Sequence, residues 1–223
     1  MNKNYCQHWS QVEWLHKTVK NKNIIIHGTH SYYSGFFNGN FESSAVRYLY
    51  GDEFSTHPET GWKPSWDIDK LIMGDYVHIA ADVKIIMGGN NNHNTQFIST
   101  YPFFDLTALK RAYKKKNDTI LGNDIWLGMS SIILPGIKIG NGVIVAAGSV
   151  VTKDIPAYSV VAGNPAKIVR KRFCDEDIYL LEKLAWWNWE DDKVSALLPF
   201  IQAASVKELV EEAVKYDLQY CNV

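Results

Sequence analysis

The chain has 223 residues, 46% of them hydrophobic and 21% charged, and its formal net charge at pH 7 is −1. That length can bury a full core, and the near-zero charge gives no support for a nucleic-acid partner or a basic membrane anchor. The three scattered cysteines, the lack of a bilayer-spanning apolar run and the lack of an N-terminal signal segment lead us to expect a soluble cytoplasmic protein.

Residues 1–23 are expected to form an N-terminal arm that packs on the body of the protein. Trp9, Trp14 and Leu15 have partly helical spacing, which favours a short helix within this arm. The run Ile24-Ile25-Ile26 predicts a first strand. An irregular segment rich in aromatic residues, Gly and Pro follows it.

Apolar residues then recur every six positions, which is neither the period of a helix nor that of a single strand. In the first block the leading residues are Met73, Ile79 and Ile85, with Val77 and Val83 four places further on. Residues 88–118 interrupt the period with a long polar and aromatic segment. Loops of this length without structure of their own are uncommon and often functional.

The six-residue period resumes after this excursion. Its leading residues are Leu121, Leu127, Ile133, Ile139, Val145 and Val151. A small or β-branched residue stands four places after each of them: Ile125, Ser131, Ile137, Val143, Ser149 and Ile155. Hexapeptide repeats of this kind are a signature of parallel β-helices, in which every sixth side chain meets the same inner edge. The sequence therefore predicts a mainly β protein built as a parallel β-helix.

The period ends near residue 165, and helices are expected beyond it. The acidic turn Asp175-Glu176-Asp177 begins a predicted amphipathic helix whose apolar face is Ile178, Leu181, Leu184 and Ala185. A second helix is predicted over about 205–217, with Val206, Leu209, Val210, Ala213 and Val214 as its apolar face. An open β-helix end exposes unpaired strand edges, so we expect these helices to cap it.

His93 is the strongest catalytic candidate, because it lies in a polar, Gly-flanked part of the excursion. A histidine there can be aimed by its neighbours, and imidazole is suited to proton transfer near neutrality. Three other histidines, His27, His30 and His78, fall in or beside the coils, where they are either packed or near the cleft. No pair has metal-ligand spacing, so no metal is expected.

The excursion resembles the active-site loop of the hexapeptide-repeat xenobiotic acetyltransferases, which include non-classical chloramphenicol acetyltransferases and streptogramin A acetyltransferases. The resemblance rests on residues 87–93 and 97–103, on Ser31-Tyr32-Tyr33, on 118–128, on 151–156 with 162–167, and on Trp186-Trp187-Asn188-Trp189. It covers about residues 24–190. One departure is Asn94, where many members of this family carry an arginine after the histidine.

The resemblance implies a left-handed parallel β-helix over residues 24–170, with the excursion 88–118 as an extended active-site loop and residues 171–223 as a helical segment. It also implies a homotrimer with each active site between two subunits, the loop of one lying over the β-helix of its neighbour.

The resemblance further implies specific roles. His93 is the implied general base. The implied acceptor-binding residues are Ser31, Tyr32, Tyr48, Tyr50 and Tyr101. The implied coenzyme A-binding residues are Trp126, Met129, Ala147, Thr152, Lys153, Lys167 and Arg170. Lysine and arginine side chains suit the phosphates of coenzyme A.

The main hypothesis is therefore an acetyl-CoA-dependent O-acetyltransferase that acetylates a hydroxyl of a hydrophobic antibiotic by direct transfer. One alternative is the same chemistry on a sugar hydroxyl of a cell-surface glycan or a nucleotide sugar. A second alternative is a non-catalytic β-helix binding protein, against which His93 and Trp126 argue.

Overall fold

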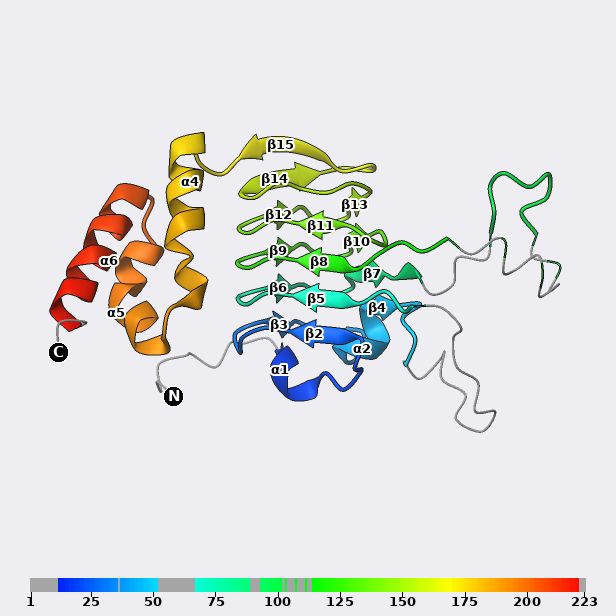
Figure 1. The fold of residues 1–223 in the computed structure, drawn as a ribbon, viewed down its shortest axis with the longest axis horizontal. Helices are drawn as coiled ribbons and strands as arrows, with labels where there is room; N and C mark the ends of the chain where they lie inside the picture. The colour runs from blue at the N-terminus through cyan, green and yellow to red at the C-terminus, as the bar shows by residue number, and fades with distance from the viewer. Residues whose placement is uncertain are drawn as a thin grey trace. The chain divides into compact units, whose positions relative to one another are not determined.

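The computed structural model describes residues 12–35, 37–51, 67–88, 93–101, 103, 107, 111 and 114–220. Two compact units emerge, Met1–Arg170 and Lys171–Val223. The first unit holds three sheets whose strands stack coil on coil in chain order (Figure 1). This is a β-helix-type fold of mostly parallel sheets.

The chain visits the three sheets in turn. One sheet contains β2 (Ile24–Ile26), β5 (Leu71–Met73), β8 (Thr119–Leu121) and β11 (Lys138–Ile139). The second contains β1 (Glu13–Trp14), β3 (Tyr32–Tyr33), β6 (His78–Ile79), β9 (Trp126–Leu127), β12 (Ile144–Val145), β14 (Ser159–Ala162) and β15 (Lys167–Lys171). The third contains β4 (Val46–Arg47), β7 (Lys84–Ile86), β10 (Ile132–Ile133) and β13 (Val150–Val151).

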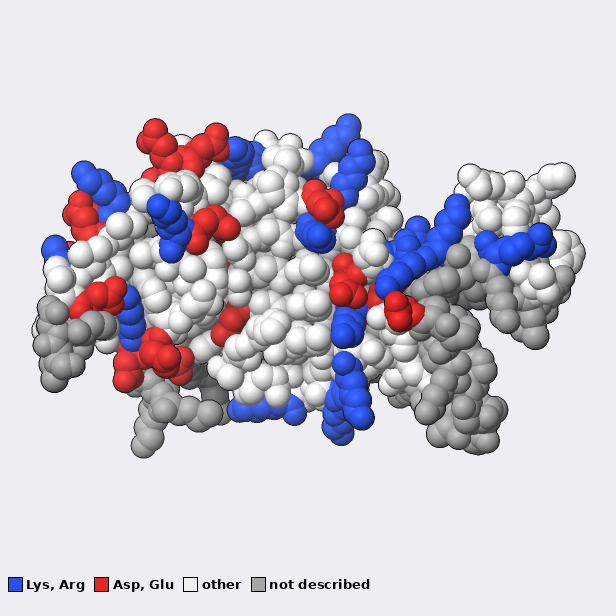
Figure 2. Space-filling model, in the orientation of Figure 1, with Lys and Arg blue, Asp and Glu red and all other residues white. Residues whose placement is uncertain are grey.

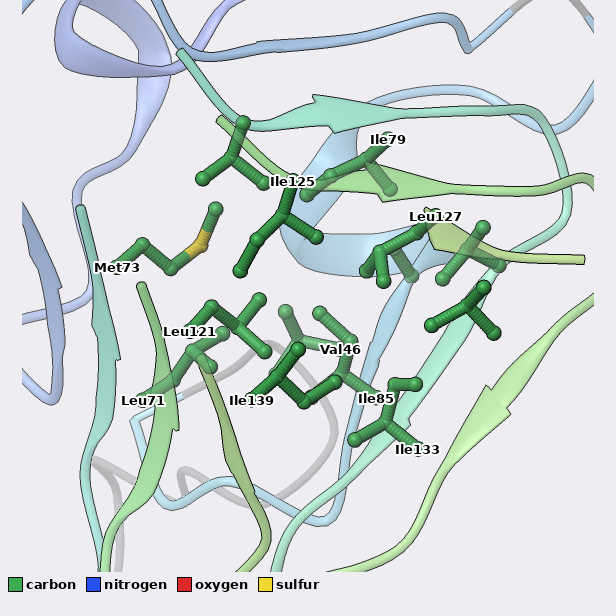
Figure 3. Packing of buried hydrophobic residues seen from close by; sticks show 14 of the residues in the cluster. Val46, Leu71, Met73, Ile79, Ile85, Leu121, Ile125, Leu127, Ile133 and Ile139 are labelled. Carbon is green, nitrogen blue, oxygen red and sulfur yellow. The ribbon is translucent and has the colours of Figure 1, made fainter. Parts of the chain in front are cut away.

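The six-residue period fills the interior as predicted. All six leading residues from Leu121 to Val151 are buried, and so are the six residues four places after them. Figure 3 shows how leaders such as Leu127, Ile133 and Ile139 meet in the centre of the coils. Burying one such side chain contributes about 1.5–3 kcal/mol, so the repeated leaders supply a large share of the folding free energy.

The coils keep their register across the excursion. Met73 pairs with Leu121 in the first sheet, and Ile85 pairs with Ile133 in the third. The strands on either side of residues 88–118 therefore stack directly on one another.

A polar ladder runs along the corner that precedes the second sheet. The Asn141 side chain accepts hydrogen bonds from the backbone N–H and the side-chain amide of Asn123, at 2.8 and 3.0 Å. The Asn123 side chain in turn accepts from the Asp75 backbone at 2.7 Å. Gly28 completes the corner with φ 76°, and a side chain there would overlap the Asp75 carboxylate. These bonds fix where the strands of the second sheet begin.

The N-terminal arm contains a short helix, as expected, but a strand precedes it. Its described part forms β1, which pairs antiparallel with β3, and then α1 (Leu15–Thr18). Trp14 therefore belongs to a strand, because pairing with β3 outweighs its weak helical spacing. Trp9 lies outside the described residues. A second short helix, α2 (Phe41–Ser44), precedes β4.

The second unit contains α4 (Asp175–Leu184), a 3-10 turn η3 (Trp186–Asn188), α5 (Asp191–Ile201) and α6 (Val206–Tyr220). The acidic start of α4 is as predicted, but Ala185 ends the helix in a left-handed conformation and is not on its apolar face. In α6, Val206, Leu209 and Ala213 are buried, whereas Val214 is exposed. The sequence analysis did not predict α5. None of the helices in the described part of the chain could cross a membrane.

Candidate active site

His93 is held by a short, locally bonded turn. The Asn94 side chain accepts from the Gln96 backbone N–H at 2.9 Å, and the Asn94 carbonyl accepts from the Phe97 N–H at 3.1 Å. Asparagine favours such turns because its side chain bonds its own backbone two residues on. Asn94 therefore shapes the backbone directly after His93.

The same segment fixes the tautomer of the His93 ring. Its Nδ1 atom lies 2.8 Å from the backbone carbonyl oxygen of Thr100. A carbonyl oxygen only accepts hydrogen bonds, so in the neutral imidazole Nδ1 carries the proton and Nε2 keeps its lone pair. Because His93 is exposed, Nε2 is available to take a proton from a hydroxyl group.

A row of rings crosses the outer face of the second sheet. Trp14 of β1 contacts Tyr32 of β3 edge-on, with ring centroids 5.7 Å apart. Tyr32 stacks on His78 of β6 at 4.6 Å, and His78 lies parallel to Trp126 of β9 at 6.2 Å. We call these four residues the aromatic row. The strand register explains it, since Tyr32 pairs with His78 and His78 with Trp126.

The aromatic row brings one residue implied to bind the acceptor and one implied to bind the cofactor onto a common surface. The family resemblance implies that Tyr32 binds the acceptor and that Trp126 contacts the thiol end of coenzyme A. Only His78 lies between these two residues in the row. Trp126 is 49% exposed. Burial raises the pKa of the Tyr32 hydroxyl, so this group stays protonated near neutral pH and can donate a hydrogen bond.

The other implied acceptor residues lie in different surroundings. Ser31 is 1% exposed; its hydroxyl donates to the Gly74 carbonyl and accepts from the Val77 N–H, both at 3.0 Å, so it joins two coils beneath Tyr32. Tyr48 is exposed and has φ 60°. The Tyr50 carbonyl accepts from the side chains of Asn21 and Asn23, which ties the end of this segment to the first coil.

Tyr101 lies on the excursion with His93. It is exposed, and its ring meets the Phe103 ring edge-on at 4.9 Å. His93 and Tyr101 lie on the excursion, whereas Tyr32 and Trp126 lie on strands of the second sheet.

The implied coenzyme A residues follow the later coils. Met129 and Ala147 occupy the same corner on adjacent coils, where the Gly148 N–H donates to the Met129 carbonyl at 2.8 Å. Thr152 and Lys153 follow β13, and Lys167 and Arg170 lie on β15. All of these side chains except Thr152 are exposed. Figure 2 shows basic side chains along the edge of the sheets that β15 occupies.

Two members of the aromatic row have no site role in the predictions from sequence. The spacing of Trp14 favours a short helix or an arm, and His78 is expected to be packed or near the cleft. The available signal was the alternation of Val77, His78 and Ile79, in which the two flanking residues point inward. The described residues contain no group of His, Cys, Asp or Glu that could hold a metal ion.

Comparisons with known proteins decide the family. Residues 118–153 match the model for the bacterial transferase hexapeptide with six repeats. A chloramphenicol acetyltransferase of Morganella morganii is 38% identical over 92% of this chain and 94% of its own length. The chain belongs to the hexapeptide-repeat xenobiotic acetyltransferase family. It is accordingly an acetyltransferase.

Other members of this xenobiotic acetyltransferase family carry different names. A virginiamycin A acetyltransferase of Staphylococcus aureus is 35% identical to this chain over 89% of the chain and 85% of its own length. Among solved structures, a galactoside acetyltransferase in complex with coenzyme A aligns with a TM-score of 0.37 and 30% identity over 48% of each chain.

Proposed function

We propose that this protein transfers the acetyl group of acetyl-CoA to a hydroxyl of an antibiotic of the chloramphenicol or streptogramin A type. The observation that carries the chemistry is the bond between His93 Nδ1 and the Thr100 carbonyl, at 2.8 Å. It leaves Nε2 as a proton acceptor on an exposed segment. The names of the family members support an antibiotic as acceptor.

In the proposed reaction, His93 Nε2 takes the proton of the acceptor hydroxyl as its oxygen attacks the thioester carbonyl carbon. The new C–O bond forms, the C–S bond breaks, and the proton passes from His93 to the departing thiolate of coenzyme A. Attack by a neutral hydroxyl is slow, so a positioned base contributes about 10²–10⁴-fold to the rate. No covalent enzyme intermediate is needed.

The substrates meet on the aromatic row in this proposal. Tyr32 lines the acceptor side and is held by Ser31 beneath it, with Tyr48, Tyr50 and Tyr101 completing the pocket. Acetyl-CoA lies along the later coils, its thiol end against Trp126. Met129, Ala147 and Thr152 flank the pantetheine chain in this placement, and Lys153, Lys167 and Arg170 meet the phosphates.

The proposal includes a homotrimer of left-handed β-helices. The excursion 88–118 of one subunit would then bring His93 to the row of its neighbour. We assign the acyltransferase chemistry to residues 24–170, with 1–23 as an arm and 171–223 as a helical segment. The scattered cysteines support a cytoplasmic location.

The proposal is tested by incubating the purified protein with acetyl-CoA and a panel of acceptors, and measuring the release of free thiol. The panel contains chloramphenicol, virginiamycin A, and a set of mono- and disaccharides. We expect turnover with an antibiotic and none above the hydrolysis background with the sugars. Turnover confined to the sugars would show that the acceptor is a sugar and not an antibiotic. The absence of turnover with every member of the panel would overturn the proposed function.

A further inference from the structure

The excursion leaves the coils after β7 and returns to them before β8 (Figure 1), and one buried carboxylate contacts both of its ends. Asp69, which lies just before β5, is 4% exposed. Its Oδ2 atom accepts a hydrogen bond from the Lys116 backbone N–H at 3.3 Å. A Cβ atom added to Gly88 would lie 2.4 Å from the same oxygen. The departing chain therefore packs against the carboxylate only because residue 88 has no side chain.

The returning end of the excursion is also held from other sides. The Asp118 side chain accepts a hydrogen bond from the Lys70 backbone N–H at 2.7 Å. Gly136 has φ 75°, and a Cβ atom there would lie 2.0 Å from the Lys116 carbonyl oxygen. The Lys116 backbone is thus contacted by Asp69 at its N–H and by Gly136 at its carbonyl.

The Asp69 carboxylate is costly to bury. Its Oδ1 atom is buried and has no hydrogen-bond partner within the described part of the chain. Burial raises the pKa of the Asp69 carboxyl above its ordinary value, although the N–H groups of Lys116 and Asn117 and the charge of Lys115 act in the opposite direction. A carboxyl whose pKa is raised on folding lowers the stability of the folded protein at pH values above its ordinary pKa. This cost favours a role for Asp69 other than stability.

We propose that Asp69 is a positioning residue for the general base, because by contacting Gly88 and Lys116 it fixes both ends of the excursion that carries His93. This inference rests on the proposed function, in which His93 takes the proton of the acceptor. Residues 88 and 93 are five positions apart, and five residues span at most about 18 Å. The place of Gly88 therefore limits where His93 can lie. A misplacement of about 1 Å at the reacting atoms can cost about a hundredfold in rate.

Three substitutions change the contact at Asp69. Asp69→Ala removes the carboxylate, and Asp69→Asn keeps an oxygen that can accept from the Lys116 N–H. Gly88→Ala places a methyl group against the carboxylate. Asp67→Ala is the matched control, since Asp67 pairs with Lys115 of the excursion at 3.4 Å but has an 89% exposed side chain. The assay measures thiol release with acetyl-CoA and either chloramphenicol or virginiamycin A, whichever the wild type uses with the higher kcat/KM.

We expect Asp69→Ala and Gly88→Ala each to lower kcat by about ten- to a hundredfold. The KM for acetyl-CoA should stay at its wild-type value, because the proposed cofactor contacts lie on the coils. Asp69→Asn should recover part of the kcat, and Asp67→Ala should match the wild type. In a His93→Ala background, Asp69→Ala should lower kcat no further, because the group that it positions is absent. Thermal unfolding confirms that each variant is folded.

Hydrogen exchange of the free protein tests the contact without any substrate. The peptide that contains Lys116 should take up deuterium faster in Asp69→Ala than in the wild type, by about three- to tenfold at this amide, because its hydrogen-bond acceptor is lost. Wild-type kcat in folded Asp69→Ala, a further loss of kcat in the His93→Ala background, or equal exchange in both proteins would overturn the role of Asp69. Absence of turnover in the wild type with both antibiotics is a different outcome. It refutes the proposed antibiotic acceptor, whereas the exchange result still decides whether Asp69 holds the excursion.

Discussion

The His30 Nδ1 atom lies 2.8 Å from Oδ2 of Asp75, and this contact joins the turn before β3 to the turn before β6. The His30 ring also stacks on the Tyr76 ring at 4.3 Å. Asp75 further accepts backbone N–H bonds from His30 at 2.7 Å and Tyr76 at 2.8 Å. One carboxylate therefore aligns the two coils that carry Tyr32 and His78.

Asp75→Asn is expected to lower the free energy of unfolding by about 1–3 kcal/mol near neutral pH, since an amide satisfies these donors less well than a carboxylate. Burial alone would raise the pKa of the Asp75 carboxyl, but the hydrogen bonds from His30 and Tyr76 lower it below its ordinary value. Its stabilisation is therefore present above the ordinary pKa of aspartate and lost as the pH falls through the lowered value in the folded protein. Urea unfolding of both proteins at equal concentration should show the difference shrinking in acid. A difference that stays constant with pH would contradict this account.

His93→Ala is expected to lower kcat by about 10²–10⁴-fold while acetyl-CoA binding persists, because the base is lost and the cofactor contacts remain. His27→Ala, which changes an exposed histidine on the β-helix, is the control. A folded His93→Ala protein with near wild-type kcat would rule out the base.

Lys153→Ala, Lys167→Ala and Arg170→Ala are each expected to raise the KM for acetyl-CoA and to leave the KM for the acceptor unchanged. A charged hydrogen bond contributes about 1.5–3 kcal/mol when desolvated, and these exposed side chains should fall at or below the lower end, about tenfold. Steady-state kinetics at saturating acceptor measures the effect. Lys22→Ala, another exposed lysine, should have none. Unchanged KM values for acetyl-CoA in all three variants would show that coenzyme A does not bind at these residues.

Sedimentation equilibrium should give a mass of about three times 25.4 kDa, because the proposed site needs His93 from one chain and the aromatic row from another. In a second experiment, His93→Ala subunits and Trp126→Ala subunits, each inactive alone, are dissociated, mixed and allowed to reassociate. Some activity should return, since a mixed trimer contains sites with both intact groups. A monomer at micromolar concentration would rule out an active site shared between two subunits.

The six-residue period predicted the core because inward-facing positions accept only a few residue types. Leu121, Ile133 and Val145 are interchangeable in that role, so they repeat. The aromatic row carries a weaker signal: Tyr32, His78 and Trp126 differ in residue type, although His78 and Trp126 each directly precede a leading residue of the period. Trp14 lies outside the period and joins the row by antiparallel pairing with Tyr32. Helix α5 was missed for another reason, since Pro199 lies inside it and proline ordinarily argues against a helix. The position of His93 relative to Trp126 could not be predicted from the six-residue period, because His93 lies on the excursion that interrupts it.

The uninterrupted pairing of Ile85 with Ile133 has a consequence for how this protein can change. The coils pair directly on either side of the excursion, so a change in its length alters the folding free energy through loop-closure entropy. Doubling the length of a loop costs only about 0.6 kcal/mol. Under the proposed function, substitutions and insertions around His93 can therefore change the acceptor specificity while the β-helix keeps its stability.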